Sequence, residues 1–214
     1  FELAARMQLS ATDALDLNSE TRETRELYGL NNDTTRSYGR RCLMARRLVE
    51  RGVRFVQLFM KGQPWDTHTA NTAGLKSCCA QTDGPVAALL TDLKRRGLFD
   101  STLVLWGGEF GRTPGAELRG NNQARGNEGR DHHPYGFSVW LAGGGIQGGK
   151  AIGATDDFGF NAVEDRFHVN DLHATMLSLL GLDHEALTYL FEGRERRLTD
   201  VGGSNDLSAR LVRR

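Results

Sequence analysis

The stretch LVLWGGEFGRTP, Leu103–Pro114, carries the clearest signal for the fold. It begins with apolar residues, passes through a pair of glycines and becomes polar, which is the pattern of a buried strand that leaves the core. The carboxylate of Glu109 follows directly, beside Gly111 and Arg112. Ligands of open α/β sheets gather beyond the carboxyl ends of the strands. We therefore expect this strand to bring Glu109 to a functional edge of the sheet.

Further strands and helices are predicted on both sides of this stretch. Residues 53–60 and 135–142 are rich in β-branched and aromatic residues, which is typical of strands. Apolar residues at helical spacing predict helices over residues 34–50, 72–96 and 170–180. Apolar strands combined with such helices indicate an α/β fold, in which a mostly parallel sheet is covered by helices on both faces.

Composition divides the chain into three parts. Residues 1–33 are polar and helix-prone only in short pieces, so we expect an irregular helical peripheral segment. Residues 34–203 contain the predicted strands and helices of the α/β domain. Residues 204–214 lack aromatic side chains and are predicted to form a mobile tail. The chain opens on Phe1, as a processed protein or a piece of a longer one would.

The charge balance narrows the classes of partner. The 214 residues include 27 basic and 27 acidic side chains, so the formal net charge is zero and neither nucleic acid nor an acidic membrane is expected as a partner. No apolar run approaches the roughly 20 residues that span a bilayer. The arginines within residues 40–51 are expected to line a solvated helix face. The oligomeric state stays open.

The residue types that could carry chemistry gather at the predicted strand ends. They fall into three groups: Asp66 and His68 after strand 53–60, Glu109 and Arg112 after strand 102–107, and Arg130, Asp131, His132 and His133 before strand 135–142. Carboxylates and imidazoles together suit a divalent metal such as zinc, manganese, calcium or iron. The two arginines suit a bidentate clamp on an oxyanion.

Each group also has a structural interpretation. Asp66 is a common turn residue, and His68 precedes a predicted helix that it could cap. His132 and His133 are equally consistent with solvated loop residues. Glu109 is equally consistent with an ion pair to a nearby arginine. None of the three spacings matches a zinc-finger or zincin motif, so the spacing alone leaves these alternatives open.

A set of ordered motifs then resembles one family. The motifs are ARRLVERGVRFVQLF, WDTH, TDLKRRGLFDSTLVLWGGEFGRTP, GRDHHPYGFSVWLAGGGIQGG, GATDD, DLHATMLSLLGL and FEGRERRLTDV. Together they resemble the C-terminal half of the DUF1501 family, uncharacterised sulfatase-like bacterial proteins that are abundant in planctomycetes. The family in turn resembles the alkaline phosphatase superfamily, whose members hold one or two metal ions beside a nucleophile on an α/β sheet.

The resemblance implies roles for particular residues. Asp66 and His68 resemble an Asp and a His of the superfamily that bind metal, and His132 or His133 resembles a further histidine ligand. Glu109 stands where the superfamily has an aspartate ligand, and Phe110 stands where it has a histidine. Phenylalanine cannot bind metal, so the resemblance implies that one ligand is lost.

The resemblance also implies a function and a location. The leading expectation is a metal-dependent hydrolase of small phosphate or sulfate esters, with Arg112 or Arg130 holding the anion. The superfamily's nucleophile lies in its N-terminal half, which this chain would lack. The alternative is a non-catalytic relative that binds metal or acts as a binding protein at the cell surface. Longer family members often carry an export signal, which implies the periplasm or the cell surface.

Overall fold

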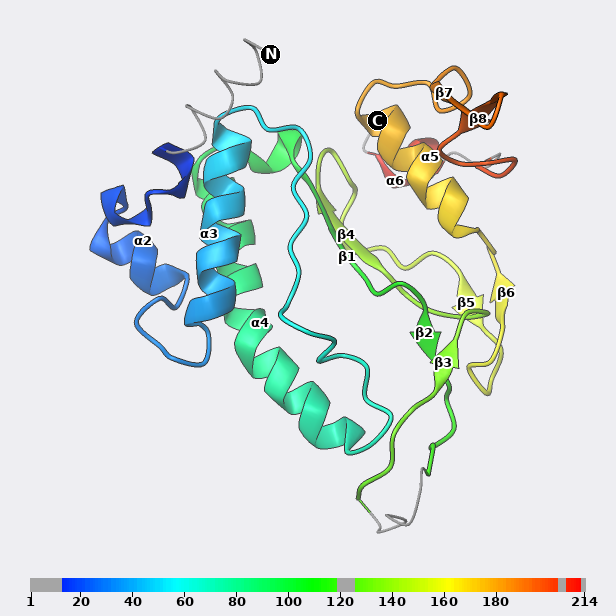
Figure 1. The fold of residues 1–214 in the computed structure, drawn as a ribbon, viewed down its shortest axis with the longest axis horizontal. Helices are drawn as coiled ribbons and strands as arrows, with labels where there is room; N and C mark the ends of the chain where they lie inside the picture. Colours follow the sequence, from blue (N-terminus) through cyan, green and yellow to red (C-terminus); the bar gives the residue numbers. More distant parts are fainter. Residues whose placement is uncertain (1–12, 119–125, 204–206, 213–214) are drawn as a thin grey trace. The chain divides into compact units, whose positions relative to one another are not determined.

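The computed structural model describes residues 13–118, 126–203 and 207–212, and the chain divides into two compact units (Figure 1). Unit 1 comprises the described parts of Phe1–Thr102 and Gly115–Asp131. Unit 2 comprises the described parts of Leu103–Pro114 and His132–Arg214.

Unit 1 is built on two long helices that lie side by side, α3 (Arg36–Glu50) and α4 (Asn71–Arg95) (Figure 1). Both were predicted from apolar spacing, and both are confirmed to within two residues at each end. Three shorter elements complete the helical part of this unit: η1 (Leu17–Ser19), α2 (Arg22–Leu27) and η2 (Phe99–Ser101). Of the predicted peripheral segment, residues 1–12 lie outside the described residues.

The core of unit 1 combines apolar side chains with a buried cation. Leu43 and Cys42 of α3 are fully buried, and Leu93 of α4 is 1% exposed. Arg46 is also only 1% exposed. The expectation of a solvated arginine face is therefore wrong for Arg46 and for its neighbour Arg47, which is also buried.

Acidic side chains explain why Arg46 is tolerated in this core. Its Nη2 lies 2.8 Å from Glu20, its Nε lies 2.9 Å from Asp92, and its Nη1 donates to Glu50. The Tyr28 hydroxyl donates to Asp92 over 3.0 Å. A buried guanidinium is stable only when it is paired in this way, so the network fixes η1, α3 and α4 together.

The strand predicted over residues 53–60 does not form. The segment is irregular in secondary structure, and its aromatic side chains Phe55 and Phe59 are 57% and 70% exposed. Near its end the Arg41 guanidinium donates to Phe59 O, and at its start Val53 N–H donates to Leu48 O and closes the preceding helix. Residue preference for strand is not sufficient where the ladder of a neighbouring strand is missing.

Unit 2 contains all the strands of the described chain, as four separate antiparallel pairs. These pairs are β1 (Leu103–Trp106) with β4 (Trp140–Gly143), β2 (Gly111–Arg112) with β3 (His132–His133), β5 (Ala154–Thr155) with β6 (Ala162–Glu164), and β7 (Thr188–Phe191) with β8 (Arg194–Arg197). The strand predicted at 102–107 is therefore confirmed, and the one predicted at 135–142 is present only at its end.

The predicted fold class is wrong. The sequence favoured a mostly parallel, alkaline phosphatase-like sheet covered by helices on both faces, whereas β1 and β4 pair antiparallel and no sheet among the described residues exceeds two strands. Parallel neighbours need a crossover, usually a helix, between them. The described residues between β1 and β4 contain no helix, so the chain turns back on itself. The result is a mixed α and β protein with small sheets.

The helix of unit 2, α5 (Val169–Leu179), confirms the prediction over 170–180. It begins with a capping box, in which the Asp171 carboxylate accepts the His168 N–H over 2.8 Å. α6 (Ser208–Leu211) packs in the same unit, because Gln147 N–H donates to Leu211 O. Of the predicted mobile tail, residues 204–206 and 213–214 lie outside the described residues. Across the described chain, no helix has both the length and the apolar character needed to cross a membrane.

Candidate metal centre

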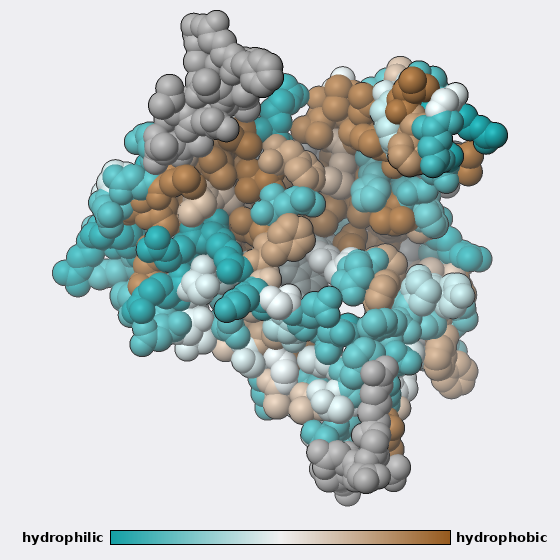
Figure 2. Space-filling view, viewed as in Figure 1, coloured by the Kyte–Doolittle hydropathy of each residue, from teal (hydrophilic) through white to brown (hydrophobic). Residues whose placement is uncertain are grey.

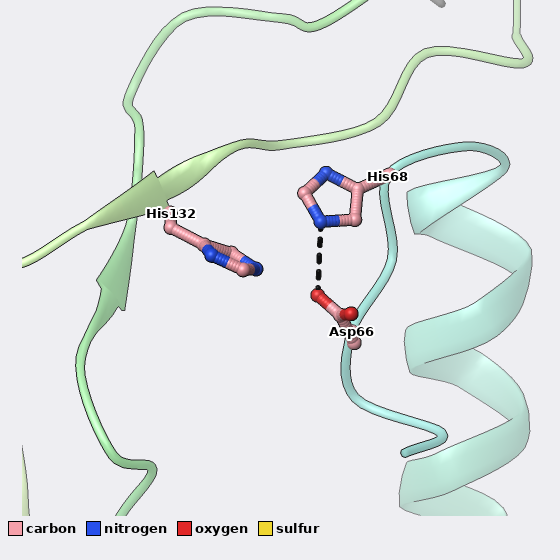
Figure 3. Close-up of side chains that lie close together, drawn as sticks. All are labelled: Asp66, His68 and His132. Carbon is pink, nitrogen blue, oxygen red and sulfur yellow. Dashed lines mark ion pairs between the residues drawn. The ribbon is translucent and has the colours of Figure 1, made fainter.

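His68 lies in the loop that leads into α4, and its ring is held by a carboxylate from the same loop (Figure 3). The Nε2 atom of His68 is 3.1 Å from Oδ1 of Asp66. The side chains of both residues are mostly buried, at 17% and 31% exposed. The two residues that the sequence singled out in the WDTH motif therefore do meet, as an imidazole and the carboxylate beside it.

A distant segment of unit 1 pairs with this loop. Arg130 N–H donates to Thr67 O over 3.0 Å, and Ala70 N–H donates to Asn127 O over 3.0 Å. Thr69 and Glu128 form an isolated antiparallel bridge between these two contacts. Backbone pairing on both sides of His68 thus fixes the loop against residues 126–131.

This pairing needs a glycine at its centre. A Cβ atom on Gly129 would lie 1.9 Å from the backbone oxygen of His68. The two segments therefore could not approach as closely with any other residue at position 129. Ala70 also adopts a left-handed backbone with φ of 49°, a conformation that costs an ordinary residue about 1 kcal/mol or more. The loop is held in this strained form by the contacts on either side.

Two further carboxylates reach the other ring nitrogen of His68. Its Nδ1 lies 2.7 Å from Oε2 of Glu117 and 3.8 Å from Oδ1 of Asp131. Glu117 is placed by a pair of backbone hydrogen bonds with Gly129, each 2.8 Å long. The Glu117 side chain is 16% exposed, whereas that of Asp131 is 53% exposed. Asp131 is therefore the more exposed of the two carboxylates that face this nitrogen.

The donor atoms of this cluster fit a divalent metal ion. One atom each from His68, Glu117 and Asp131 lies within 4.8 Å of the others. Imidazole nitrogen and carboxylate oxygen are both ligands of zinc, manganese and iron, so these three side chains could hold such an ion. Asp66 contacts the ring nitrogen that faces away from Glu117, and a carboxylate in that position commonly orients a metal-binding histidine.

The structure tests the two structural interpretations of the WDTH residues, His68 as a helix cap and Asp66 as a turn residue. The residue that precedes α4 as its cap is Ala70, which makes no side-chain capping bond, so the interpretation of His68 as a helix cap is wrong. Asp66 does lie in a tight turn, because its N–H donates to Gln63 O over 3.1 Å. Turn formation and a role beside His68 are compatible, since the turn uses the backbone of Asp66 and the contact uses its carboxylate.

The other predicted site residues belong to unit 2. Arg112 of β2 is directly opposite His132 of β3 in the strand register. The Phe110 ring lies 4.6 Å from the His132 ring, centroid to centroid. Glu109 is exposed in the bend before β2. The β2–β3 pair thus brings Arg112 and His132 together, with Phe110 packed against the imidazole.

His133 is the buried member of the histidine pair, at 8% exposed. Its Nε2 contacts Phe160 O, and because a carbonyl only accepts, this nitrogen must carry the proton. The Tyr135 and Phe160 rings contact the imidazole edge to face, each with centroids 5.6 Å from it. These contacts favour a packing role for His133 within its own unit.

Glu117 is not among the residues that the sequence predicts for the site. It is a single acidic residue in a polar loop, and neither its spacing nor its neighbours distinguish it. Asp131 is among the residues whose type predicts a metal ligand, although the resemblance gives it no role. Glu117 is placed by its backbone pairing with Gly129, and because that pairing leaves no pattern in the sequence, no sequence signal identifies this residue.

Comparisons with known proteins give one result. A family model described as "Protein of unknown function (DUF1501)" matches residues 1–209. A search of curated proteins and a search of solved structures gave no match. The match lends no support to the narrower assignment of the chain to a C-terminal half. Since it covers nearly all of the 214 residues, the chain belongs to the DUF1501 family.

Proposed function

We propose that this chain supplies the metal site of a hydrolase that acts on phosphate or sulfate esters. The observation that carries the proposal is the imidazole of His68, which has Glu117 at 2.7 Å and Asp131 at 3.8 Å from one nitrogen. The three side chains would be the ligands. A nitrogen donor with carboxylates suits zinc, manganese or iron better than calcium, which prefers oxygen donors throughout.

Asp66 has an orienting role in this proposal. Its carboxylate lies 3.1 Å from Nε2 of His68, on the nitrogen that does not face Glu117. An acceptor at that position fixes the tautomer of the ring, so that Nδ1 presents its lone pair to a cation. This differs from the expectation that Asp66 is itself a ligand.

The chemistry expected at the site follows from its donors. A divalent cation held there would supply Lewis-acid stabilisation of the charge that develops on a phosphoryl or sulfuryl oxygen. Arg130, next to Asp131 in the chain, is proposed to hold the anionic group of a small ester, because a guanidinium binds an oxyanion through two parallel hydrogen bonds. Arg112, the other arginine expected to form the clamp, belongs to unit 2, so it has no role in this proposal. None of these side chains is proposed to be the nucleophile.

Metal binding is the first test. After treatment with a chelator, the protein is titrated with zinc or manganese by calorimetry, and bound metal is counted by elemental analysis. We expect about one equivalent, as the donor set of one open site provides. His68→Ala should lose it, whereas His173→Ala, on the exposed face of α5, should keep it. Equal binding by wild type and His68→Ala would reject the site.

Turnover is the second test. Chromogenic aryl phosphate and aryl sulfate esters are assayed with each metal that binds. We expect hydrolysis that depends on metal and on His68, and that weakens with Arg130→Gln because the anion is held less well. Metal binding without hydrolysis of either ester class would reject the hydrolase and retain the metal site.

One observation favours a second function. The Phe110 ring packs against His132 with centroids 4.6 Å apart, and the resemblance alone implies that a metal-binding histidine would stand at position 110 in an active enzyme. A fold that keeps one metal and lacks a second would serve as a metal-binding module without turnover. Phe110→His distinguishes the two functions, because a gain of a second metal equivalent with hydrolysis would indicate a lost enzyme site.

A further inference from the structure

The β7–β8 hairpin of unit 2 exposes side chains that proteins usually bury. All four residues of β7 are exposed, with Tyr189 at 47%, Leu190 at 71% and Phe191 at 52%. The two residues of the turn, Glu192 and Gly193, have φ of 50° and 74°, the left-handed pair that closes a tight antiparallel hairpin. In Figure 2, brown hydrophobic surface and teal hydrophilic surface lie side by side over β7 and β8.

The register of the hairpin sorts these side chains by face. Tyr189 is opposite Arg196, and Phe191 is opposite Arg194. Directly opposite residues of an antiparallel pair share a face, and so do residues two apart on one strand. Tyr189, Phe191, Arg194 and Arg196 therefore form one surface, which we call the aromatic–arginine face.

No ion pair among the described residues neutralises the two arginines of this face. Among the residues that the structure describes, neither Arg194 nor Arg196 forms an ion pair, whereas Arg197 on the opposite face pairs with Glu185 over 3.0 Å. All of the acidic residues in the hairpin lie outside the face, since Glu195 is opposite Leu190 and Glu192 is in the turn. Carboxylates of a binding partner would complement the two guanidinium groups.

We propose that the aromatic–arginine face is a docking surface for a partner protein that presents an extended acidic segment. Tyrosine, phenylalanine and arginine are the residues enriched in protein interfaces. A hairpin of only two strands is marginal by itself and gains stability when a third strand or another covering element is added. An extended segment would bond to the hairpin edge, with alternate side chains on this face.

Charge favours a protein over a polyanion here. The hairpin carries three arginines and two glutamates, and the whole chain has a formal net charge of zero. Nucleic acids and anionic membranes draw most of their affinity from many cations acting together. Two arginines beside two aromatic rings suit short-range recognition of individual carboxylates.

The test uses two synthetic peptides of about ten residues, the length of a strand with its flanks. One alternates glutamate with valine, and the other alternates lysine with valine; both carry a fluorophore for anisotropy titration against the whole protein. We expect the glutamate peptide to bind, and the double variant Arg194→Gln and Arg196→Gln to weaken it about tenfold or more. Tyr189→Ala should weaken it as well. Arg166→Gln, which changes an exposed arginine of the same unit outside the hairpin, should have no effect.

Several outcomes would overturn the proposal. Equal binding of the two peptides would show that the arginines do not select carboxylates, and unchanged binding by the double variant would place the peptide elsewhere. Self-association in sedimentation velocity that the double variant abolishes would assign the face to a second copy of the chain. Binding of heparin or phosphatidylserine vesicles without binding of the glutamate peptide would assign it to a polyanion. Circular dichroism confirms that the variants stay folded. None of these outcomes depends on the metal site.

Discussion

The Nδ1 atom of His68 lies 2.7 Å from Oε2 of Glu117, and this contact joins residues 49 positions apart in the chain. It exists because the loop before α4 pairs with residues 126–131 on both sides of His68. A second bridge, from Gly129 to the segment that contains Glu117, places Glu117 opposite Gly129. The candidate metal centre is therefore a product of backbone pairing among three irregular segments, and no strand or helix supplies its ligands directly.

Replacing Glu117 should weaken metal binding while leaving the fold intact. Glu117→Gln keeps the shape of the side chain and removes its charge, so the cation loses an anionic ligand. We expect an affinity loss of at least about tenfold, since changes to partners outside the ligand set already cause about 10- to 100-fold losses. Competition with a metallochromic chelator measures the affinity. Glu23→Gln, an exposed glutamate of α2, should match wild type. An unchanged affinity in Glu117→Gln would exclude Glu117 as a ligand.

A methyl group at position 129 should separate the two segments. In Gly129→Ala the new Cβ would meet the backbone oxygen of His68 at 1.9 Å, and backbone atoms cannot give way as a flexible side chain can. We expect stability to fall by roughly 1–3 kcal/mol, as overpacking usually causes, and metal binding to be lost. Urea unfolding and metal titration measure both effects. Gly115→Ala is the matched control, because nothing lies within 4 Å of its added Cβ. Wild-type metal binding in Gly129→Ala would show that the site does not depend on this pairing.

The sequence predicts the helices well and the sheet poorly. α3, α4 and α5 follow from apolar spacing because helical bonds and one buried face are local properties of the chain. Strand pairing joins distant residues, so the direction of β4 relative to β1 cannot be read from either strand alone. Residues 53–60 have strand composition and still form no strand.

The candidate site shows the same contrast between contacts that are local in the sequence and contacts between distant residues. Asp66 and His68 are close in sequence, so their contact follows from one short loop. Glu117 reaches His68 only through the pairing of Gly129, which leaves no periodic signal. The burial of Arg46 was missed for a similar reason, because its partners Glu20 and Asp92 come from other elements.

The cysteines should differ sharply in reactivity. Burial raises the pKa of the Cys42 thiol to about 12, and the side chain is fully buried, so little reactive thiolate forms at pH 8. Cys79 is only partly buried. We expect iodoacetamide to label Cys79 in the native protein and Cys42 only in denaturing urea, as mass spectrometry of the peptides would show. Rapid native labelling of Cys42 would mean that α3 does not pack as described.

Removing the buried guanidinium should destabilise unit 1 strongly. Arg46→Met leaves Glu20 and Asp92 buried beside an apolar side chain, and breaking a buried pair in this way typically costs about 3–5 kcal/mol. Arg22→Met is the control, because its ion pair with Glu26 is on the surface, with Arg22 85% exposed, and surface pairs contribute about 0–1 kcal/mol. Urea unfolding compares the two variants. Losses of similar size would mean that the Arg46 network adds no more than a surface pair.

The same network should make stability sensitive to acid through Glu20. Burial acts to raise the pKa of Glu20, but the guanidinium groups of Arg47 and Arg46 outweigh it and hold the pKa below 4.5. In the unfolded chain the carboxyl takes up its proton at higher pH than in the folded chain, so its contribution is complete above pH 4.5 and is lost as the pH falls through the folded pKa. Glu20→Gln should therefore be less stable than wild type near pH 7, and the difference should shrink below pH 4.5, as urea unfolding over a pH series would measure. Glu23→Gln, with an exposed carboxyl, should follow the wild-type curve throughout. A Glu20→Gln deficit that stays constant down to the acid transition would show that the folded protein does not favour the charged form of Glu20.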